Sequence, residues 1–330
     1  MDKTITALGL MSGTSMDGID ASLLRSDGEK NIDLLGNLFI KYDSELKNKL
    51  QNFTNNINSI TDLNKNLDEF NILERLITIE HSEIVLKICK NLNIKPDIIG
   101  FHGQTILHRP EQSYSIQMGN AKLLSQLSKT SVINQFRKND LKNGGEGAPL
   151  TPIYHHNLKK KLNIKEPVIF LNIGGIANYT FSKSDYFSAR DVGPGNCLMD
   201  FYMKKIKNID FDKDGSLAAS GKIDYPLINN ILEHEFYISK KKHSFDIKDF
   251  DINFVKGLSI QNAMANLNYF SAKLIYENIK NAIDDNYIIL LCGGGRKNKT
   301  LVTNLQNFFP NKIYLIDKFN IDGDFIESQA

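Results

Sequence analysis

The residues from 9 to 20 have the types and spacing of a phosphate-binding turn. An apolar run, Ile5 to Met11, leads into the small polar residues Ser12-Gly13-Thr14-Ser15, and a second apolar run follows from Ile19 to Leu24. Small residues let a ligand approach the backbone, and their N–H groups and hydroxyls can surround a phosphate. Asp17 and Asp20 would suit a magnesium ion that bridges phosphate oxygens. The alternative is a tight hairpin with polar turn residues.

Two more turns of this kind follow, although the sequence contains neither a P-loop nor a Rossmann glycine pattern. The apolar run Pro167 to Ile173 ends at Gly174-Gly175, and an apolar alternation resumes at Ile176. The run Tyr287 to Cys292 ends at Gly293-Gly294-Gly295 and leads into a helical pattern. Glycines there permit close approach of a ligand to a helix N-terminus. Three such turns in this order resemble the actin-like ATPase fold of sugar kinases, actin and heat-shock chaperones.

Polar residues near predicted strand ends could act on a substrate. Asp191 ends a predicted strand beside the bend Gly193 to Asn196, where a carboxylate can serve as a general base. The alternative is a helix-capping or turn aspartate. His102 and His108 follow a short buried strand and suit hydrogen bonding to a sugar or a carboxylate. Their alternative is a pair of satisfied loop histidines.

A third polar group surrounds the loop Lys142 to Pro149, the strongest loop signal in the chain and a candidate hinge. Arg137, just before this loop, could bind an acidic substrate group through two parallel hydrogen bonds. It could instead pair with Asp140 on a helix surface, which contributes little energy. His155-His156 is not expected to bind a metal, because adjacent helical positions do not face one ion.

The elements that must position these residues form a repeated order of strands and helices. Alternation and helical periodicity predict the first half from strands 5–11, 19–25, 32–41, 96–100 and 131–135 with helices 72–91 and 119–129. The second half has predicted strands 167–173, 176–181, 186–191, 287–292 and 312–317 with helices 194–207, 256–282 and 297–309. Two similar α/β halves that face a cleft are the expected place for a nucleotide and its acceptor.

Composition narrows the class of protein. The chain has 330 residues, enough for two domains, with 41% hydrophobic and 24% charged residues. A net charge of +2 is too small to indicate nucleic-acid or membrane binding. No apolar run approaches the ~20 residues that cross a bilayer, and no signal peptide is evident. The scattered cysteines Cys89, Cys197 and Cys292 indicate reduced thiols in a cytoplasmic enzyme.

The chain is similar to the anhydro-N-acetylmuramic acid kinase family. The resemblance rests on the segments Gly-Leu-Met-Ser-Gly-Thr-Ser-Met-Asp-Gly-Ile-Asp (9–20), Phe-His-Gly-Gln-Thr (101–105), His-Arg-Pro (108–110), Gln-Met-Gly-Asn (117–120), Gly-Gly-Glu-Gly-Ala-Pro-Leu-Thr-Pro (144–152), Asn-Ile-Gly-Gly-Ile-Ala-Asn (172–178), Asp-Val-Gly-Pro-Gly-Asn (191–196), Asp-Lys-Asp-Gly (212–215) and Cys-Gly-Gly-Gly (292–295). These motifs occur in family order over nearly the whole chain.

This resemblance implies an α/β protein of two actin-like (ribonuclease H-like) domains, 1–134 and 135–330, with a nucleotide cleft between them. The family converts 1,6-anhydro-N-acetylmuramic acid, ATP and water to N-acetylmuramic acid 6-phosphate in cell-wall recycling. The implied partners are the sugar and ATP with Mg²⁺, in a homodimer that binds neither nucleic acid nor membrane. Asp191 would be the base that activates water, and Asp17 or Asp20 would lie near Mg²⁺.

The remaining implied contacts divide between ATP and the sugar. Residues implied to bind ATP are Gly13, Thr14, Ser15, Met16, Asp17, Gly18, Ile19, Asp20, Gly174, Gly175, Asn178, Gly293, Gly294 and Gly295. Residues implied to bind the sugar are His102, Gln104, Arg137, Gly193 and Asn196.

The sequence also departs from the family pattern. Gln135 replaces an aspartate that usually precedes Phe136-Arg137, the segment 240–246 lacks the family's Lys-Ser-Thr-Gly-Arg loop, and the C-terminal helix of the family is expected to be missing after Ala330. Three alternatives therefore stay open. They are an ordinary sugar kinase in which Asp191 deprotonates a hydroxyl, an ATP-gated interaction module without enzymatic activity, and a truncated inactive remnant.

Overall fold

The chain divides into two compact units. The computed structural model describes residues 4–29, 31–233, 245, 249–283 and 286–330. Unit 1 comprises Met1–Lys161 and Phe325–Ala330, and unit 2 comprises Leu162–Asp324. Each unit contains an apolar core of its own. The division differs from the expected boundary at 134/135, because the two helices that follow residue 135 belong to unit 1.

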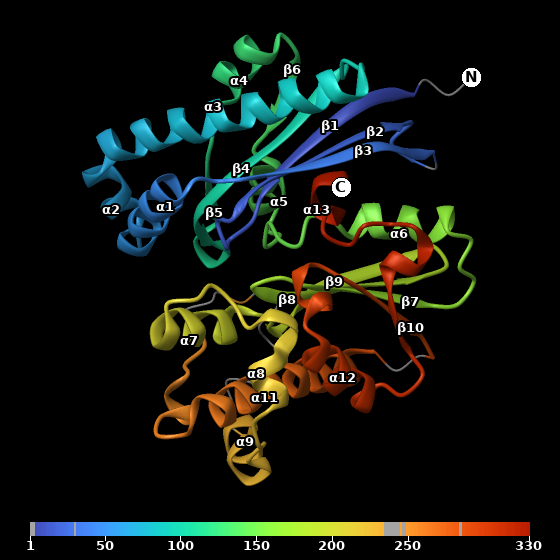
Figure 1. Cartoon of the computed structure of the whole chain (residues 1–330). Helices are drawn as coiled ribbons and strands as arrows, with labels where there is room; N and C mark the ends of the chain where they lie inside the picture. The colour runs from blue at the N-terminus through green and yellow to red at the C-terminus, as the bar shows by residue number, and fades with distance from the viewer. Residues whose placement is uncertain (1–3, 30, 234–244, 246–248, 284–285) are drawn as a thin grey trace. The chain divides into compact units, whose positions relative to one another are not determined.

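Unit 1 is built on a six-stranded sheet in the order β3-β2-β1-β4-β5, with β6 paired to β4. β1 is antiparallel to β2 and parallel to β4, β2 is antiparallel to β3, and β4 is parallel to β6. The long helix α3 lies across one face of this sheet, and α4 packs beside it (Figure 1). The strands are β1 (Ile5–Ser12), β2 (Gly18–Ser26), β3 (Ile32–Lys41), β4 (Ile98–Arg109), β5 (Tyr114–Met118) and β6 (Ser131–Asn134). The helices are α1 (Ser44–Asn56), α2 (Ile60–Lys65), α3 (Leu67–Leu92), η1 (Pro110–Gln112), α4 (Ala121–Ser128), α5 (Phe136–Lys142), α6 (Pro152–Lys161) and α13 (Ile326–Gln329).

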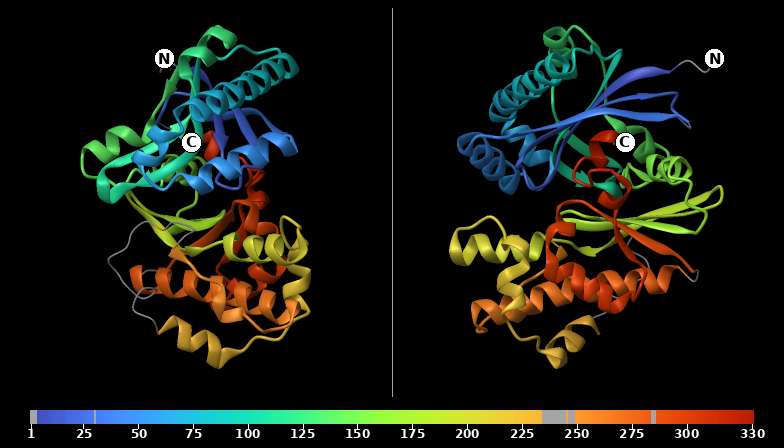
Figure 2. Two further views of the ribbon diagram at one scale, coloured as in Figure 1. Left: turned by 90° about the vertical axis from the view of Figure 1, so that its left-hand side faces the viewer. Right: turned by 45° about the vertical axis from the view of Figure 1, so that its right-hand side comes forward.

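Unit 2 contains a five-stranded sheet in the order β11-β10-β7-β8-β9, which matches the order β6-β4-β1-β2-β3 within unit 1. β7 is antiparallel to β8 and parallel to β10, so that it occupies the place of β1 in unit 1. The helices α11 and α12 lie side by side along this unit (Figure 2). The strands are β7 (Val168–Ile173), β8 (Ile176–Lys183), β9 (Tyr186–Pro194), β10 (Ile288–Cys292) and β11 (Ile313–Leu315). The helices are α7 (Cys197–Lys207), η2 (Lys213–Gly215), α8 (Ser216–Ala219), α9 (Tyr225–Leu232), η4 (Asn253–Val255), α11 (Ile260–Ala282), η5 (Gly294–Lys297), α12 (Lys299–Phe308) and η6 (Ile316–Phe319).

The repeated topology confirms the predicted α/β class with two actin-like, ribonuclease H-like domains. In both units three antiparallel strands are followed by crossovers to parallel strands. Every residue of β7 is buried, which fits a central strand read from an unbroken apolar run. No helix among the described residues combines the length and apolar character needed to cross a membrane.

Two strands are longer than predicted, and this moves site residues into the sheets. β4 does not end at residue 100, because beyond Phe101 it pairs with β5, a strand that the sequence analysis missed. His102 and His108 therefore lie in a strand rather than in a loop. β9 does not end at Asp191, because Gly193 and Pro194 continue its pairing with β8. The expected strand-end position of Asp191 is thus corrected to a position inside β9.

The short helix α13 returns from unit 2 to pack against β1 and β2 of unit 1. A side chain at Gly9 would overlap the carbonyl of Ser328, so glycine is needed there. The hydroxyls of Ser22 and Ser328 lie 2.7 Å apart, and Tyr154 donates a hydrogen bond to Gln329 Oε1 at 2.6 Å. The last described residues are therefore an integral part of unit 1.

Candidate active site

The turn between β1 and β2 combines one tightly packed side chain with one open glycine. Met16 adopts a left-handed backbone conformation with φ +54° and its side chain is buried in the core of unit 1. The Met16 N–H donates to Gly13 O at 3.1 Å, which closes the turn. A Cβ placed on Gly13 would meet only Ser15 Oγ, at 3.9 Å. The backbone at Gly13 is therefore accessible to a ligand, while the buried Met16 side chain fixes the turn to the core of unit 1.

Uncharged buried side chains support this turn. Ser12 Oγ lies 2.7 Å from Gln104 Oε1 and 3.1 Å from Gly18 O, and the Tyr42 hydroxyl donates to Ser12 Oγ at 3.2 Å. Gln104 Nε2 donates to Gly13 O at 3.1 Å. Burial raises the pKa of Tyr42 above its ordinary value, so the phenol is neutral in this network. The sequence predicted that Gln104 binds the sugar. In the structure its amide group forms hydrogen bonds with Ser12 and Gly13 of the turn.

Two carboxylates flank the turn, and their chemistry fits a magnesium–nucleotide complex. Asp17 Oδ1 lies 2.6 Å from Lys47 Nζ, and the backbone carbonyl of Asp17 accepts from Tyr42 N at 3.0 Å. Asp20 is half-buried in β2, opposite Met11. The described residues contain no group of three or more potential metal ligands. Carboxylate oxygens such as those of Asp17 and Asp20 are of the type that Mg²⁺ binds.

In unit 2 the first glycine turn is joined to the N-terminus of α7. Gly195 N and Asn196 N donate to Gly175 O and Gly174 O, both at 2.8 Å, and Cys197 N donates to Gly175 O at 3.2 Å. A Cβ on Gly195 would overlap Gly174 O, whereas a Cβ on Gly174 would meet only Ile176 O at an ordinary 3.6 Å. Gly195 is therefore required by packing, and Gly174 leaves its backbone open.

Asp191 lies across from Asn178 on adjacent strands of the same unit. The two residues are partners in the β8–β9 register, next to a bulge, and directly opposite side chains share one face of a sheet. Asp191 is 7% exposed, and its Oδ2 accepts a hydrogen bond from Phe245 N at 2.8 Å. Asn178 Oδ1 is buried with no hydrogen-bond partner among the described residues. A buried acceptor without a partner invites a donor from a ligand or a water molecule.

The third glycine turn follows β10 and also has one open position. A Cβ on Gly293 would overlap Asn172 Oδ1, and one on Gly295 would overlap Ile173 Cγ2. Gly293 also has φ +77°, which favours glycine. Gly294 is exposed, and a Cβ there would meet no atom of the described part of the chain within 4 Å. Each of the three turns thus contains a glycine that packing by the described residues leaves open.

The model of the anhydro-N-acetylmuramic acid kinase family matches residues 5–330. The chain belongs to this family of kinases. The family member from Pelagibacter ubique is 45% identical over 340 residues, which cover 100% of this chain and 91% of that protein. The member from Rhodospirillum rubrum is 35% identical over 331 residues, with coverage of 100% and 86%. A solved structure similar to this chain, the activator of 2-hydroxyisocaproyl-CoA dehydratase from Clostridium difficile with bound ADPNP, has 13% identity and a TM-score of 0.48, with coverage of 98% and 92%.

In this member of the kinase family, two residues expected to bind the sugar contact each other. Arg137 Nη2 and Nε lie 2.9 and 3.3 Å from His102 Nε2, and His102 Nδ1 lies 2.7 Å from Gly103 O. Burial, and then the Arg137 charge, lower the pKa of His102 to about 3, so it is neutral and accepts from Arg137 through Nε2. Arg137 Nη1 also donates to Gly147 O at 2.7 Å, while Asp140 Oδ2 accepts from Gly147 N at 2.7 Å. The candidate hinge loop is thus held at Gly147 within unit 1.

The remaining expected residues fall on both units. Thr14 and Ser15 lie in the β1–β2 turn, Gly18 and Ile19 begin β2, and Gly193 lies in β9 with Asn196 just before α7. The departure at 240–246 lies outside the described residues except for Phe245, which contacts Asp191. Gln135 has a left-handed backbone, with φ +60°, at the start of α5.

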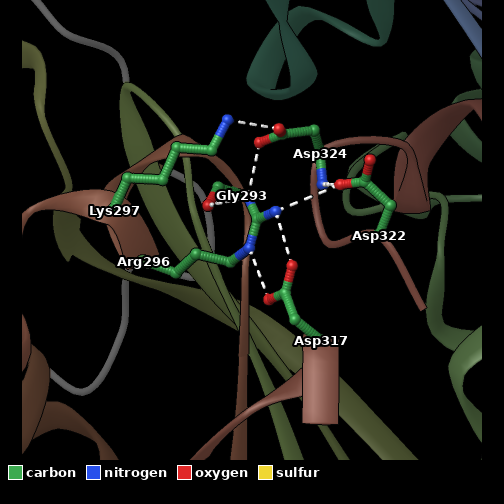
Figure 3. A network of polar contacts seen from close by, with 6 residues as sticks. All are labelled: Gly293, Arg296, Lys297, Asp317, Asp322 and Asp324. Atoms are coloured by element: carbon green, nitrogen blue, oxygen red, sulfur yellow. Dashed lines mark hydrogen bonds and ion pairs between the residues drawn. The ribbon is translucent and has the colours of Figure 1, made fainter. Parts of the chain in front are cut away.

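Sequence reasoning missed an ionic network beneath the third turn (Figure 3). Arg296, which follows Gly295, contacts Asp317, Asp322 and Asp324. The sequence signal was a group of acidic residues at and just after the end of the last predicted strand, which parallel pairing of β10 and β11 brings beside the glycines.

Proposed function

We propose that this protein is an ATP-dependent kinase that converts 1,6-anhydro-N-acetylmuramic acid and water to N-acetylmuramic acid 6-phosphate. Membership of the kinase family supports the substrate class. The observation that carries the proposal is the buried carboxylate of Asp191 opposite the amide oxygen of Asn178, which has no hydrogen-bond partner among the described residues. Two acceptors on one face of a sheet can orient both protons of a single attacking water.

The proposed reaction couples ring opening to phosphoryl transfer. Asp191 accepts a proton from water as the water oxygen bonds to the anomeric carbon. The bond from that carbon to the 6-oxygen breaks, and the 6-oxygen bonds to the γ-phosphorus as ADP leaves. Hydrolysis of a glycosidic bond ordinarily needs an acid to neutralise the leaving oxygen. Here the phosphoryl group takes the place of that acid's proton, so one carboxylate is sufficient.

We further propose that the open glycines of the three turns are nucleotide-binding positions of their own units. In unit 1, Gly13 and its neighbours would bind phosphates; in unit 2, Gly174 would bind phosphates and the turn at Gly294 would bind the adenosine part. Asp17 or Asp20 would hold Mg²⁺, which offsets the negative charge of the β- and γ-phosphates. The ion pair between Asp17 and Lys47 is mostly exposed on the Asp17 side, so Asp17 can exchange this partner at little energetic cost.

The sugar would be oriented by the pair of His102 and Arg137. The neutral imidazole leaves Arg137 fully charged, and the guanidinium suits the carboxylate that this muramic acid derivative carries. Cell-wall recycling in the cytoplasm as a homodimer is the corresponding biological role that we propose. The expected absence of nucleic-acid and membrane partners belongs to the same proposal.

The test is to incubate the protein with Mg-ATP and the anhydro sugar, and to measure ADP and the sugar product by mass spectrometry. We expect equimolar ADP and a phosphorylated sugar that has gained one water. A phosphorylated sugar with its anhydro ring intact, or no sugar-dependent ADP, would reject the proposal. A panel of reducing amino sugars is the control, because an ordinary sugar kinase would phosphorylate them without adding water.

A further inference from the structure

The buried guanidinium of Arg296 is the centre of a network that surrounds the third glycine turn (Figure 3). Its side chain is 5% exposed. Nε and Nη2 donate to the two carboxylate oxygens of Asp317 at 2.8 and 2.9 Å, a bidentate arrangement. Nη2 also contacts Asp322 Oδ1 at 3.1 Å, and Nη1 contacts Asp324. Arg296 therefore binds three carboxylates at once.

The network fixes the backbone of the turn as well as the carboxylates. Nη1 of Arg296 donates to Gly293 O at 3.1 Å, and Gly293 N donates to Gly323 O at 2.8 Å. A Cβ on Gly323 would meet Arg296 Nε at 2.6 Å, so glycine at 323 makes room for the guanidinium. Both polar groups of the Gly293 backbone are thus used, one toward Arg296 and one toward the segment that carries the aspartates.

The electrostatics favour the ionised forms of Asp317 and Asp324. Hydrogen bonds from Arg296 hold the pKa of Asp317 below its ordinary value. Burial alone would raise the pKa of Asp324, but hydrogen bonds from Arg296 and Lys297 outweigh burial and leave this pKa lowered. The network therefore keeps its geometry at neutral pH.

Stability alone does not account for this arrangement. Ion pairs with partly exposed carboxylates contribute little stability, although their directional hydrogen bonds specify geometry. Here the geometry that is specified includes one carbonyl of the turn next to the exposed, uncovered Gly294. A rigid turn binds a ligand more tightly than a mobile one, because less conformational entropy is lost on binding.

We propose that Arg296 is a positioning residue for the nucleotide: it holds the Gly293–Gly295 turn so that Gly294 can lie against the adenosine part of ATP. This inference rests on the proposed function. Arg296 itself does not touch the nucleotide and acts through the carbonyl of Gly293. Loss of the network should therefore weaken nucleotide binding while sugar binding and the chemical step are preserved.

The test compares Arg296→Lys with Lys299→Ala, measured on the full chain. Lysine keeps the charge but cannot reproduce the bidentate contact with Asp317. We expect Arg296→Lys to raise the ADP dissociation constant and the KM for ATP about tenfold, as for loss of one charged hydrogen bond. The KM for the sugar and kcat should stay within about twofold. Lys299 is 80% exposed, lies 3.7 Å from Asp214 and serves as the matched control with unchanged constants.

A second variant keeps the test decisive if Arg296→Lys fails to fold. Gly294→Ala adds a methyl group where the chain has open space, so its melting temperature should equal that of the parent protein. It should nevertheless weaken ADP binding. Unchanged ADP affinity in a folded Arg296→Lys protein, or in Gly294→Ala, would overturn the inference.

Calorimetric titration of ADP without sugar separates this inference from the proposed function. If the parent protein binds ADP but makes no sugar phosphate, the proposed function fails and the role of Arg296 is still judged by the variants. If the parent protein makes sugar phosphate and Arg296→Lys binds ADP normally, only the inference fails. Absence of ADP binding by the parent protein would overturn both.

Discussion

The turn between β1 and β2 rests on uncharged side chains, whereas the turn after β10 rests on an arginine and aspartates. Ser12, Gln104 and Tyr42 support the first through neutral hydrogen bonds. Arg296 and Asp317 support the second through an ion pair. A neutral support adds no fixed charge beside a turn proposed to bind phosphates, where a buried carboxylate would repel the ligand. An ionic support is compatible with the turn proposed for the uncharged adenosine.

The largest effect is expected for Asp191→Asn, which tests whether catalysis depends on Asp191 while the two turns contribute to nucleotide binding. Asp191→Asn keeps the shape of the side chain but removes the base, so kcat should fall about 10²–10⁴-fold. ADP affinity should change little, because the variant leaves both turn supports intact. Rapid-quench measurement of sugar phosphate together with ADP titration checks this. Retention of most of the activity would show that another group is the base.

The next effect comes from placing a charge in the neutral support. In Gln104→Glu a fully buried carboxyl would have a raised pKa in the folded protein. Its unfolded form ionises near pH ~4.3, so the free energy of unfolding should fall as pH rises above that value. The expected slope is about 1.4 kcal/mol per pH unit until the pH reaches the folded pKa. Denaturant unfolding between pH 4 and 8 measures this loss.

Gln104→Leu is the control for that experiment. It removes the hydrogen bonds that Gln104 makes with Gly13 O and Ser12 Oγ and should cost about 1–3 kcal/mol at every pH. If the free energy of unfolding of Gln104→Glu were equally independent of pH, the turn would not require an uncharged side chain at position 104.

A smaller effect distinguishes glycines that packing requires from those that a ligand requires. Gly295→Ala forces a methyl group into Ile173 and should lower the free energy of unfolding by about 1–3 kcal/mol. Gly13→Ala meets no neighbour closer than 3.9 Å and should stay within about 0.5 kcal/mol of the parent protein while the KM for ATP rises. Equal destabilisation by both changes would remove the distinction.

The smallest effect is the different acid sensitivity of the two turns. The pKa of Asp317 and that of Asp324 are lowered in the folded protein. Their stabilisation is complete above the ordinary Asp pKa of ~3.9 and is lost as pH falls through the lower folded values. Amide exchange, corrected for its intrinsic pH dependence, should show that Gly293–Gly295 loses protection before Gly13–Met16 on acidification. Simultaneous loss would mean that the ionic support does not control its turn.

The sequence predicted the positions of the strands and glycine turns well, but it did not predict the side chains that form hydrogen bonds with the turns. The turns at Gly13, Gly174 and Gly294 each follow a buried strand that periodicity located within a residue or two. The side chains beneath them were not predicted, because their contacts join distant parts of the chain. Ser12 and Gln104 are 92 residues apart, and Arg296 and Asp317 are 21 residues apart. Hydrophobic periodicity and short motifs do not predict contacts between residues so far apart in the sequence.

The candidate site shows the same limit. Asp191 was singled out from the sequence as a candidate base, but its position inside β9 depends on pairing with β8 that continues past a bulge. Gln104 and the pair of His102 and Arg137 were singled out by type and motif. Gln104 contacts Gly13, and His102 contacts Arg137. These contacts depend on β4 continuing to Arg109, which local sequence patterns did not predict.

The return of α13 to unit 1 has a consequence for synthesis of the chain. Unit 2 is continuous in sequence, whereas unit 1 begins at the N-terminus and is completed by Phe325–Ala330. The space above Gly9 is filled only when Ser328 has been made. During translation, the contacts of β1 and β2 with α13 can therefore form only after the whole of unit 2 has been synthesised.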